Sequence, residues 1–400
     1  MDALSIDADA LADDVGALVQ VPSVTGEEHA AIGWLAERAT ELGLRCELVE
    51  HDLAALRAHP DHPGEEARRT ELVGLSVTLP GTAPGRLCLN GHVDVVAPGT
   101  VAWRHGPWSG VVEDGCVHGR GAVDMKGGVV AALHALAALR DAGAAVPEVV
   151  LQCVSSEEDG GLGTFAALQR DARFDACLIP EPTGFDVVCA QAGALTFRGT
   201  VRGRAAHAAM RLEGRSAIDR YVHIHAALAA HEERLNADVA HPAMRALGLP
   251  YPVSVGRVTA GEWSSSVPDR LVFEGRVGVR IGEEPTAARA ALEAAVRAAD
   301  DEAPAVEIAW TGGAYAPGET DPEHPWVRRV AAAVAAERGP TRTAGVPWGA
   351  DMRLFTARGI PTVMVGTSGI ELAHAVDERA SVDELVALAR IIVRAVVATA

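Results

Sequence analysis

Seven carboxylate and imidazole residues fall in short motifs whose side chains could together bind metal ions and activate water. The motifs are N-G-H-V-D, G-R-G-A-V-D-M-K-G-G, S-S-E-E-D-G-G, P-E-P-T and E-L-A-H. Carboxylates and imidazoles are hard and borderline donors that suit zinc, with cobalt or manganese as substitutes. Such a set, converging on one point, is what a two-metal hydrolase needs. The residues are His92, Asp94, Asp124, Glu157, Glu158, Glu181 and His374.

The elements expected beside these motifs would bring the side chains to one edge of a sheet. Three motifs directly follow short apolar runs that predict buried strands, and His374 follows a fourth run after a short loop. Because ligands bind outside the carboxyl ends of the strands in an open α/β sheet, these side chains should converge. Asp124 lies in a glycine-rich loop before a predicted helix over 126–141, where glycines allow close backbone approach. The predicted strands cover residues 86–90, 148–154, 174–179 and 361–366.

Neighbouring residues in these motifs are expected to have different roles. Adjacent strand residues point to opposite sides, so one of Glu157 and Glu158 can bind metal while the other takes a proton from metal-bound water. In His92-x-Asp94, the Asp94 carboxylate can either bind metal or receive the ring N–H and fix the ligating tautomer. A phosphate loop at 119–128 is disfavoured, because the G-x-x-x-x-G-K-[ST] spacing is absent. Any one of these acidic residues alone would more often be a surface charge, so the conjunction of five motifs carries the argument.

The bulk properties of the chain narrow the class of protein. Its 400 residues are too many for one ordinary core and predict two domains. The net charge of −19 argues against nucleic acids and anionic membranes as partners. Six scattered cysteines without a C-x-x-C pair favour buried thiols over disulfides or zinc thiolates. No signal-like N-terminus and no apolar run of 18 residues or more is found, so we expect a cytoplasmic protein.

The pattern of predicted elements changes near residue 192 and changes back after residue 312. Outside these limits, strands alternate with helices, which predicts an α/β domain with a mostly parallel sheet. Inside them, the predicted order is β-α-β-β-α-β, that of a small ferredoxin-like α+β sandwich. We therefore expect a discontinuous catalytic domain over 1–191 and 312–400, with a smaller domain inserted at 192–311.

Taken together, the motifs resemble those of the co-catalytic di-zinc family of aminoacylases and carboxypeptidases. That family includes acetylornithine deacetylase and succinyl-diaminopimelate desuccinylase, and the resemblance covers essentially the whole chain, with the motifs in the same order. The resemblance implies two Zn²⁺ ions, with Co²⁺ or Mn²⁺ as substitutes. It places His92 and Glu181 on one ion, Glu158 and His374 on the other, and Asp124 between them.

The same resemblance implies roles for other residues. Glu157 would be the general base and acid, and Asp94 would orient His92. A glutamate at position 181 is found in the acylases and carboxypeptidases of the family, whereas the aminopeptidases have an aspartate. The inserted domain resembles the lid and dimerisation domain of the family, and R-G-R-A-A-H-A-A matches its G-x-x-x-H-[SA] segment. His207 would then reach a neighbouring active site across the dimer and steady the oxyanion, although a purely structural role for it remains open.

The inserted domain also departs from the family pattern. Where many members have N-x-[IV]-P, this chain has S-S-S-V-P, with Ser265 in place of the asparagine. Where they have D-x-R, it has R-V-G, with Arg276 and Gly278 in place of the aspartate and arginine. That arginine commonly grips the substrate carboxylate, and Arg276 or Arg280 are the candidates to replace it. The departure weakens the expectation of an ordinary α-amino-acid substrate.

The sequence thus predicts a zinc-dependent amidohydrolase in which a zinc-activated water cleaves the amide bond of a small N-acyl amine or amino-acid-like compound, as in the deacetylases. A homodimer formed through the inserted domain is expected. One alternative is a dipeptidase or carboxypeptidase that uses the same site. Another is a metal-binding module without catalysis, against which Glu157 argues, because binding alone needs no base.

Overall fold

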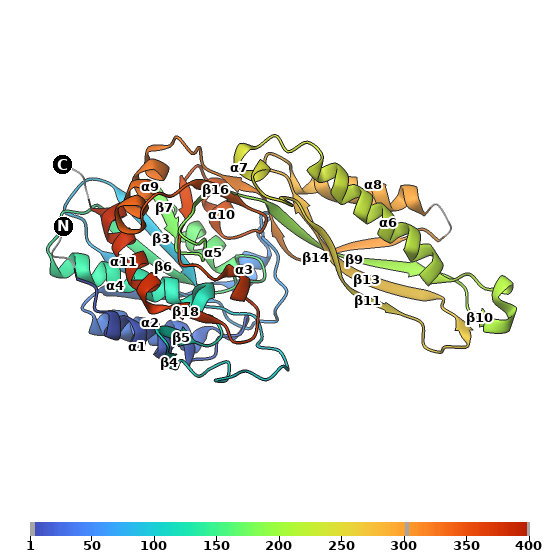
Figure 1. Cartoon of the computed structure of the whole chain (residues 1–400), viewed down its shortest axis with the longest axis horizontal. Coiled ribbons are helices and arrows are strands. Elements are labelled where there is room, and N and C mark those ends of the chain that lie inside the picture. Colours follow the sequence, from blue (N-terminus) through green and yellow to red (C-terminus); the bar gives the residue numbers. More distant parts are fainter. Residues whose placement is uncertain (1–4, 301–303, 398–400) are drawn as a thin grey trace. The chain divides into compact units, whose positions relative to one another are not determined.

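The computed structural model describes residues 5–300 and 304–397, which form two compact units (Figure 1). The larger unit holds the described residues up to Cys189, the segment Glu319–Ala344 and the described residues from Ala350 onward. The smaller unit holds the described part of Ala190–Gly318 together with Gly345–Gly349. The sequence predicts an insertion at 192–311, whereas the smaller unit spans the described part of Ala190–Gly318 and includes Gly345–Gly349.

The larger unit is built on a nine-stranded mixed sheet with the order β1-β2-β6-β3-β7-β17-β8-β15, and β16 pairs with β8. Its middle strands β6, β3, β7 and β17 are parallel, as expected for strands joined through helices. Strands β1, β2 and β8 pair antiparallel on either side of them. The bounds are β1 Arg45–Glu50, β2 Val73–Leu79, β3 Arg86–His92, β6 Glu148–Val154, β7 Ala176–Ile179, β8 Val187–Gln191, β15 Gly318–Glu319, β16 Thr343–Val346 and β17 Thr362–Met364.

Helices cover the sheet, and the central strands β7 and β17 are buried along their whole length for that reason, whereas the edge strand β1 is largely exposed. All residues of β6 after Glu148 are buried. Helix α4 packs against α1 and α11. Among the described residues, Ala122–Asp141 is a helical stretch long and apolar enough to span a membrane, but 89% of its apolar 18-residue window is buried inside the protein, as in a core helix. The helix bounds are α1 Ala8–Val19, α2 His29–Glu41, α3 Leu53–Arg57, α4 Gly127–Asp141, α5 Leu162–Arg170, α9 Pro325–Arg338, α10 Met352–Thr356 and α11 Val382–Val396.

A small three-stranded sheet joins two segments that are far apart in the chain. Strand β5 (Cys116–His118) pairs antiparallel with both β4 (Val112–Glu113) and β18 (Arg379–Ser381). The backbone N–H of Gly119 also donates to the carbonyl of Glu378 at 2.9 Å. The glycine-rich loop that carries Asp124 therefore starts beside the segment that follows His374.

The smaller unit is a four-stranded antiparallel sheet with the order β11-β13-β9-β14 and two helices, α6 and α8, packed together on it (Figure 1). The chain order β-α-β-β-α-β with this strand order is that of the expected ferredoxin-like sandwich. Its core includes Phe197 and Phe273, whose rings meet edge to face at 6.0 Å. The bounds are β9 Gly193–Arg202, β10 Ala206–His207, α6 Ala217–Asn236, α7 Pro242–Arg245, β11 Val253–Ala260, β12 Ser266–Val267, β13 Arg270–Val279, α8 Pro285–Ala299 and β14 Glu307–Tyr315.

Candidate active site

Five of the predicted residues form two donor groups that share Asp124. Donor atoms of His92, Asp124 and Glu181 lie within 4.8 Å of one another, and so do those of Asp124, Glu158 and His374. Nε2 of His92 is 3.1 Å from Oδ1 of Asp124 and 3.8 Å from Oε1 of Glu181. Nε2 of His374 is 3.6 Å from Oδ2 of Asp124 and 3.1 Å from Oε1 of Glu158. Each oxygen of Asp124 faces a different group, which is the arrangement of a carboxylate that bridges two metal ions.

The ends of the parallel strands place these side chains, as the sequence predicts. His92 is the last residue of β3 and is buried. Glu157 and Glu158 lie in the turn after β6, and Glu181 comes two residues after β7. His374 follows β17 through a loop with a short 3-10 helix, has φ 62°, and is the exposed member of the set. The carboxyl ends of three adjacent parallel strands thus supply most of the site.

The contact between His92 and Asp94 differs from the predicted one. Nδ1 of His92 lies 2.9 Å from the backbone carbonyl of Asp94, whereas the nearest Asp94 carboxylate oxygen is 3.7 Å away. A carbonyl can only accept, so Nδ1 carries the proton and Nε2 keeps its lone pair toward Asp124. Asp94 therefore orients the ring through its main chain, and its carboxylate is free for another task.

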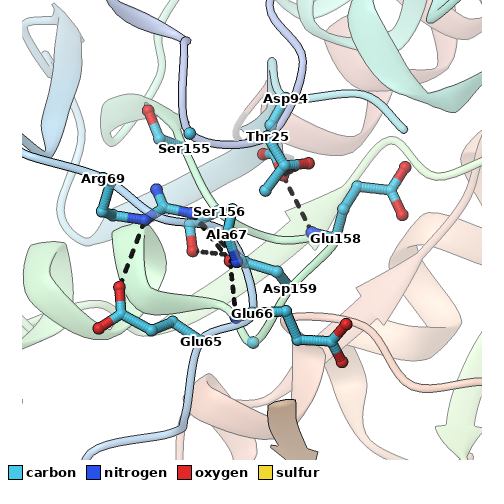
Figure 2. A network of polar contacts seen from close by, with 12 residues as sticks. Thr25, Glu65, Glu66, Ala67, Arg69, Asp94, Ser155, Ser156, Glu158 and Asp159 are labelled. Atoms are coloured by element: carbon cyan, nitrogen blue, oxygen red, sulfur yellow. Dashed lines mark hydrogen bonds and ion pairs between the residues drawn. The ribbon is translucent and has the colours of Figure 1, made fainter. Parts of the chain in front are cut away.

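The carboxylate of Asp94 holds the turn that carries the paired glutamates (Figure 2). Oδ1 accepts a hydrogen bond from the backbone N–H of Glu157 at 3.1 Å, and Oδ2 accepts one from the N–H of Glu158 at 3.0 Å. The hydroxyl of Thr25 also donates to Oδ2 at 3.3 Å. Because only the backbone of Glu157 and Glu158 is engaged by Asp94, their side chains can take separate directions, and of the two only Glu158 belongs to a donor group.

The electrostatics of the site fit bound cations. Burial raises the pKa of Glu157 and of Glu181 well above the usual range, and neighbouring carboxylates add to the effect. Burial and the charge of Asp124 raise the pKa of Glu158. Burial alone would raise the pKa of Asp124 as well, but hydrogen bonding to His92 keeps it lowered. Carboxylates this close together in the protein interior repel one another, and a pair of divalent cations would supply the missing positive charge.

Sequence reasoning missed Glu378, which fixes the backbone around Asp124. Its Oε1 accepts from the N–H groups of Val123 at 3.0 Å and of Asp124 at 3.3 Å. Its Oε2 accepts from Nη1 of Arg120 at 2.7 Å. Both Glu378 and Arg120 are buried. Arg120 lies inside the recognised glycine-rich motif, but nothing in the sequence pairs that motif with a glutamate more than 250 residues further on.

Lys126, in the same motif, was also given no role from the sequence. It is fully buried, and its Nζ donates to the carbonyls of Leu18 at 3.1 Å and Val21 at 2.8 Å. Burial lowers its pKa to about 7. The lysine therefore ties the end of α1 to the helix that follows Asp124.

The predicted residues of the inserted domain lie in the smaller unit. His207 is exposed, and its Nδ1 accepts from the N–H of Ala209 at 3.1 Å. Arg276 is exposed on β13. Arg280 donates to the backbone carbonyls of Leu235 and Arg234 at the end of α6, at 2.9 Å and 2.6 Å. The guanidinium of Arg280 thus binds the carbonyl groups at the end of α6.

A further donor group, His105, Glu113 and His118, lies within the larger unit. The carboxylate of Glu113 accepts from Arg104 at 2.7 Å and lies 3.0 Å from Nε2 of His105. Nε2 of His118 faces the backbone carbonyl of Glu113 at 3.3 Å and must donate to it. With its charge balanced by an arginine and one imidazole engaged, this group is adequately explained without a metal.

Comparison with known proteins supports the resemblance. The sequence profile of peptidase family M20/M25/M40 matches residues 88–398. The succinyl-diaminopimelate desuccinylase of Methylorubrum populi is 33% identical over 393 residues, which cover 92% of this chain and 93% of the relative. The aminopeptidase PepT of Bacillus cereus has a similar structure, with a TM-score of 0.73, 22% identity and 98% of each chain covered. The YXEP protein of Bacillus subtilis, described as a dinuclear metal binding peptidase from the M20 family, matches with a TM-score of 0.65 and 15% identity over 99% of this chain and 98% of its own.

Proposed function

The chain belongs to peptidase family M20/M25/M40, and from this premise we propose that it uses two zinc ions to remove the acyl group from a small N-acyl amine or amino-acid-like compound. It is a hydrolase of amide bonds. The observation that carries the proposal is the pair of donor groups that share Asp124, with Glu157 in the adjoining turn.

In this proposal the five donors hold the metal pair. His92 and Glu181 would hold one ion and Glu158 and His374 the other, and Asp124 would serve both, as the distances between these side chains permit. When bound, the ions would polarise the amide carbonyl and lower the pKa of the attacking water. Imidazole and carboxylate donors at this ratio suit zinc, and Co²⁺ or Mn²⁺ are the expected substitutes.

Glu157 is the proposed general base and acid. It takes a proton from the attacking water and delivers it to the amide nitrogen as the C–N bond breaks, which leaves a carboxylate and an amine. Burial and the repulsion of neighbouring carboxylates raise its pKa, so the side chain can hold the proton between the two steps. The N–H of Glu157 is fixed by Asp94, which gives the side chain a defined point of attachment.

His207 is the proposed oxyanion donor, supplied by the second copy of a homodimer. Because Nδ1 of His207 accepts from Ala209, the neutral ring carries its proton on Nε2. A neutral histidine in this tautomer can donate to a developing oxyanion without first gaining a proton. Mixing inactive H207A with inactive E157Q protein tests this role, since only a mixed dimer contains one complete site. No recovered activity would exclude it.

The desuccinylase relative favours acyl-amino-acid substrates, and a dipeptidase or carboxypeptidase with the same site is the competing proposal. Ser265 and Gly278 stand where many family members have asparagine and arginine, so Arg276 or Arg280 would have to bind a substrate carboxylate in their place. A hydrolysis screen decides between them. We expect cleavage of N-succinyl, N-acetyl or N-formyl amines that is lost with a chelator. Cleavage confined to unblocked dipeptides would favour the peptidase, and no turnover at all would refute the proposal. Cytoplasmic location stays a prediction that cell fractionation can test.

A further inference from the structure

The turn that carries Glu157 and Glu158 is tied at its far side to a buried arginine from a distant part of the chain (Figure 2). Nη2 of Arg69 lies 3.0 Å from both Oδ1 and Oδ2 of Asp159, the residue that follows Glu158. The Arg69 side chain is 0% exposed and that of Asp159 is 5% exposed. Hydrogen-bonded ion pairs at this depth are rigid, because neither charge can be left without its partner.

The carboxylate of Asp159 also gathers backbone and hydroxyl groups from two segments. Oδ1 accepts from the hydroxyl of Ser156, which closes the turn upon itself. Oδ2 accepts from the N–H groups of Glu66 at 3.0 Å and Ala67 at 2.8 Å. Asp159 therefore joins the turn after β6 to the segment 65–69 that precedes β2.

Two anchors thus hold the turn from opposite sides. Asp94 binds the N–H groups of Glu157 and Glu158, and Arg69 binds Asp159 immediately after them. Ser156, at the start of the turn, has φ 69°, and its carbonyl accepts from Gly161 N–H at 2.6 Å. Because the backbone is held on both sides of Glu157, the position from which its side chain extends is restrained.

Arg69 is also the cation of a buried acidic cluster. Its Nη1 lies 3.3 Å from Oε1 of Glu28, and its Nε lies 3.6 Å from Oε2 of Glu65. Burial, together with the charge of Asp94, raises the pKa of Glu28 to about 7. Without the guanidinium, Glu28, Asp94 and Asp159 would repel one another around the turn that they now hold.

We propose that Arg69 is a positioning residue for the reaction: through Asp159 it fixes the turn from which Glu157 reaches the reacting atoms. The inference rests on the proposed role of Glu157, which Arg69 itself does not contact in any hydrogen bond or ion pair described above. Misplacement of a catalytic group by about 1 Å can cost about 100-fold in rate. Loss of the arginine should therefore lower kcat by about 10- to 100-fold and leave KM within about two-fold.

The test compares R69M, R69K and D159N with R342M as a matched control. Arg342 is an exposed arginine of the same unit, and its ion pair with Asp186 at 2.8 Å involves neither Arg69 nor the carboxylates around it. Steady-state kinetics are combined with zinc content, thermal unfolding and amide hydrogen exchange of the peptide 155–161 in the metal-loaded enzyme without substrate. We expect faster exchange of that peptide and lower kcat in R69M and D159N at unchanged zinc content, partial recovery in R69K, and wild-type values in R342M.

Each other outcome has a defined meaning. Unchanged kcat in a folded D159N or R69K variant with slow exchange would overturn the inference, and these two milder variants decide the case if R69M does not fold. A fall in kcat that only follows the loss of folded protein or of zinc would reduce Arg69 to a stabilising role and would also overturn it. If the wild type hydrolyses no amide, the proposed function fails, while the exchange rates still show whether Arg69 holds the turn.

Discussion

Replacing Glu157 by glutamine should separate the chemical step from metal binding. The amide has the same shape, and the backbone N–H that donates to Asp94 is retained, so the turn should keep its position. Glu157 lies outside both donor groups, so we expect two metal ions per chain, as in the wild type. General acid–base catalysis is worth about 100- to 10,000-fold, and one group serves both proton transfers here, so kcat should fall about 1,000- to 10,000-fold. That loss corresponds to about 4–5.5 kcal/mol of activation free energy.

The matched control is E158Q, one residue further along the same turn. Oε1 of Glu158 lies 3.1 Å from Nε2 of His374, and the residue belongs to the second donor group. This variant should lose one metal ion per chain, as measured by elemental analysis after dialysis, and recover part of its activity in excess Zn²⁺. The reasoning is refuted if E157Q loses metal while E158Q retains it, or if E157Q keeps more than about a tenth of the wild-type kcat.

Three further outcomes are expected. E378Q should weaken metal binding about 10- to 100-fold in a chelator competition, because Glu378 fixes the backbone of Asp124 and outer contacts of this kind have that effect. H374A should bind one ion fewer, and undiminished zinc content would contradict the assignment of His374. In E28Q, urea unfolding of the apoprotein should show a gain over the wild type that grows by up to about 3 kcal/mol from pH 4 to pH 8. The pKa of Glu28 is raised to about 7 in the folded state, so the wild type loses stability as pH rises from the unfolded value toward 7, and glutamine does not.

The sequence predicted the parts of the site that depend on local pattern. Apolar runs before His92, Glu157 and Glu181 became β3, β6 and β7, and their parallel pairing brought the side chains together. The β-α-β-β-α-β order of the smaller unit was likewise visible, because strand and helix periods differ. The antiparallel strands beside the parallel centre were not predicted, because the pairing partners of a strand are set by packing across the whole sheet and not by the strand's own residues.

The supports of the site were not predictable for a related reason. Arg69 and Glu378 lie in segments without a motif, and each acts on a residue far away in the chain. Only the fold brings segment 65–69 against the turn after β6, and only β18 places Glu378 beside the Asp124 loop. The carbonyl contact to His92 was not predicted, because a sequence motif indicates side-chain partners and not main-chain ones. In the structure the backbone carbonyl of Asp94 accepts the ring proton.

The distribution of buried charge links these supports to the chemistry. Arg69 neutralises Asp159, and Arg120 neutralises Glu378. Both carboxylates accept hydrogen bonds from backbone N–H groups, and neither belongs to a donor group. In the described part of the chain, the donor carboxylates have only imidazoles within ion-pair distance. An arginine there would compete with a metal ion for the same oxygens, whereas an imidazole can join the carboxylates as a ligand. The carboxylates of Asp124, Glu158 and Glu181 are therefore placed where cations could bind without displacing an arginine.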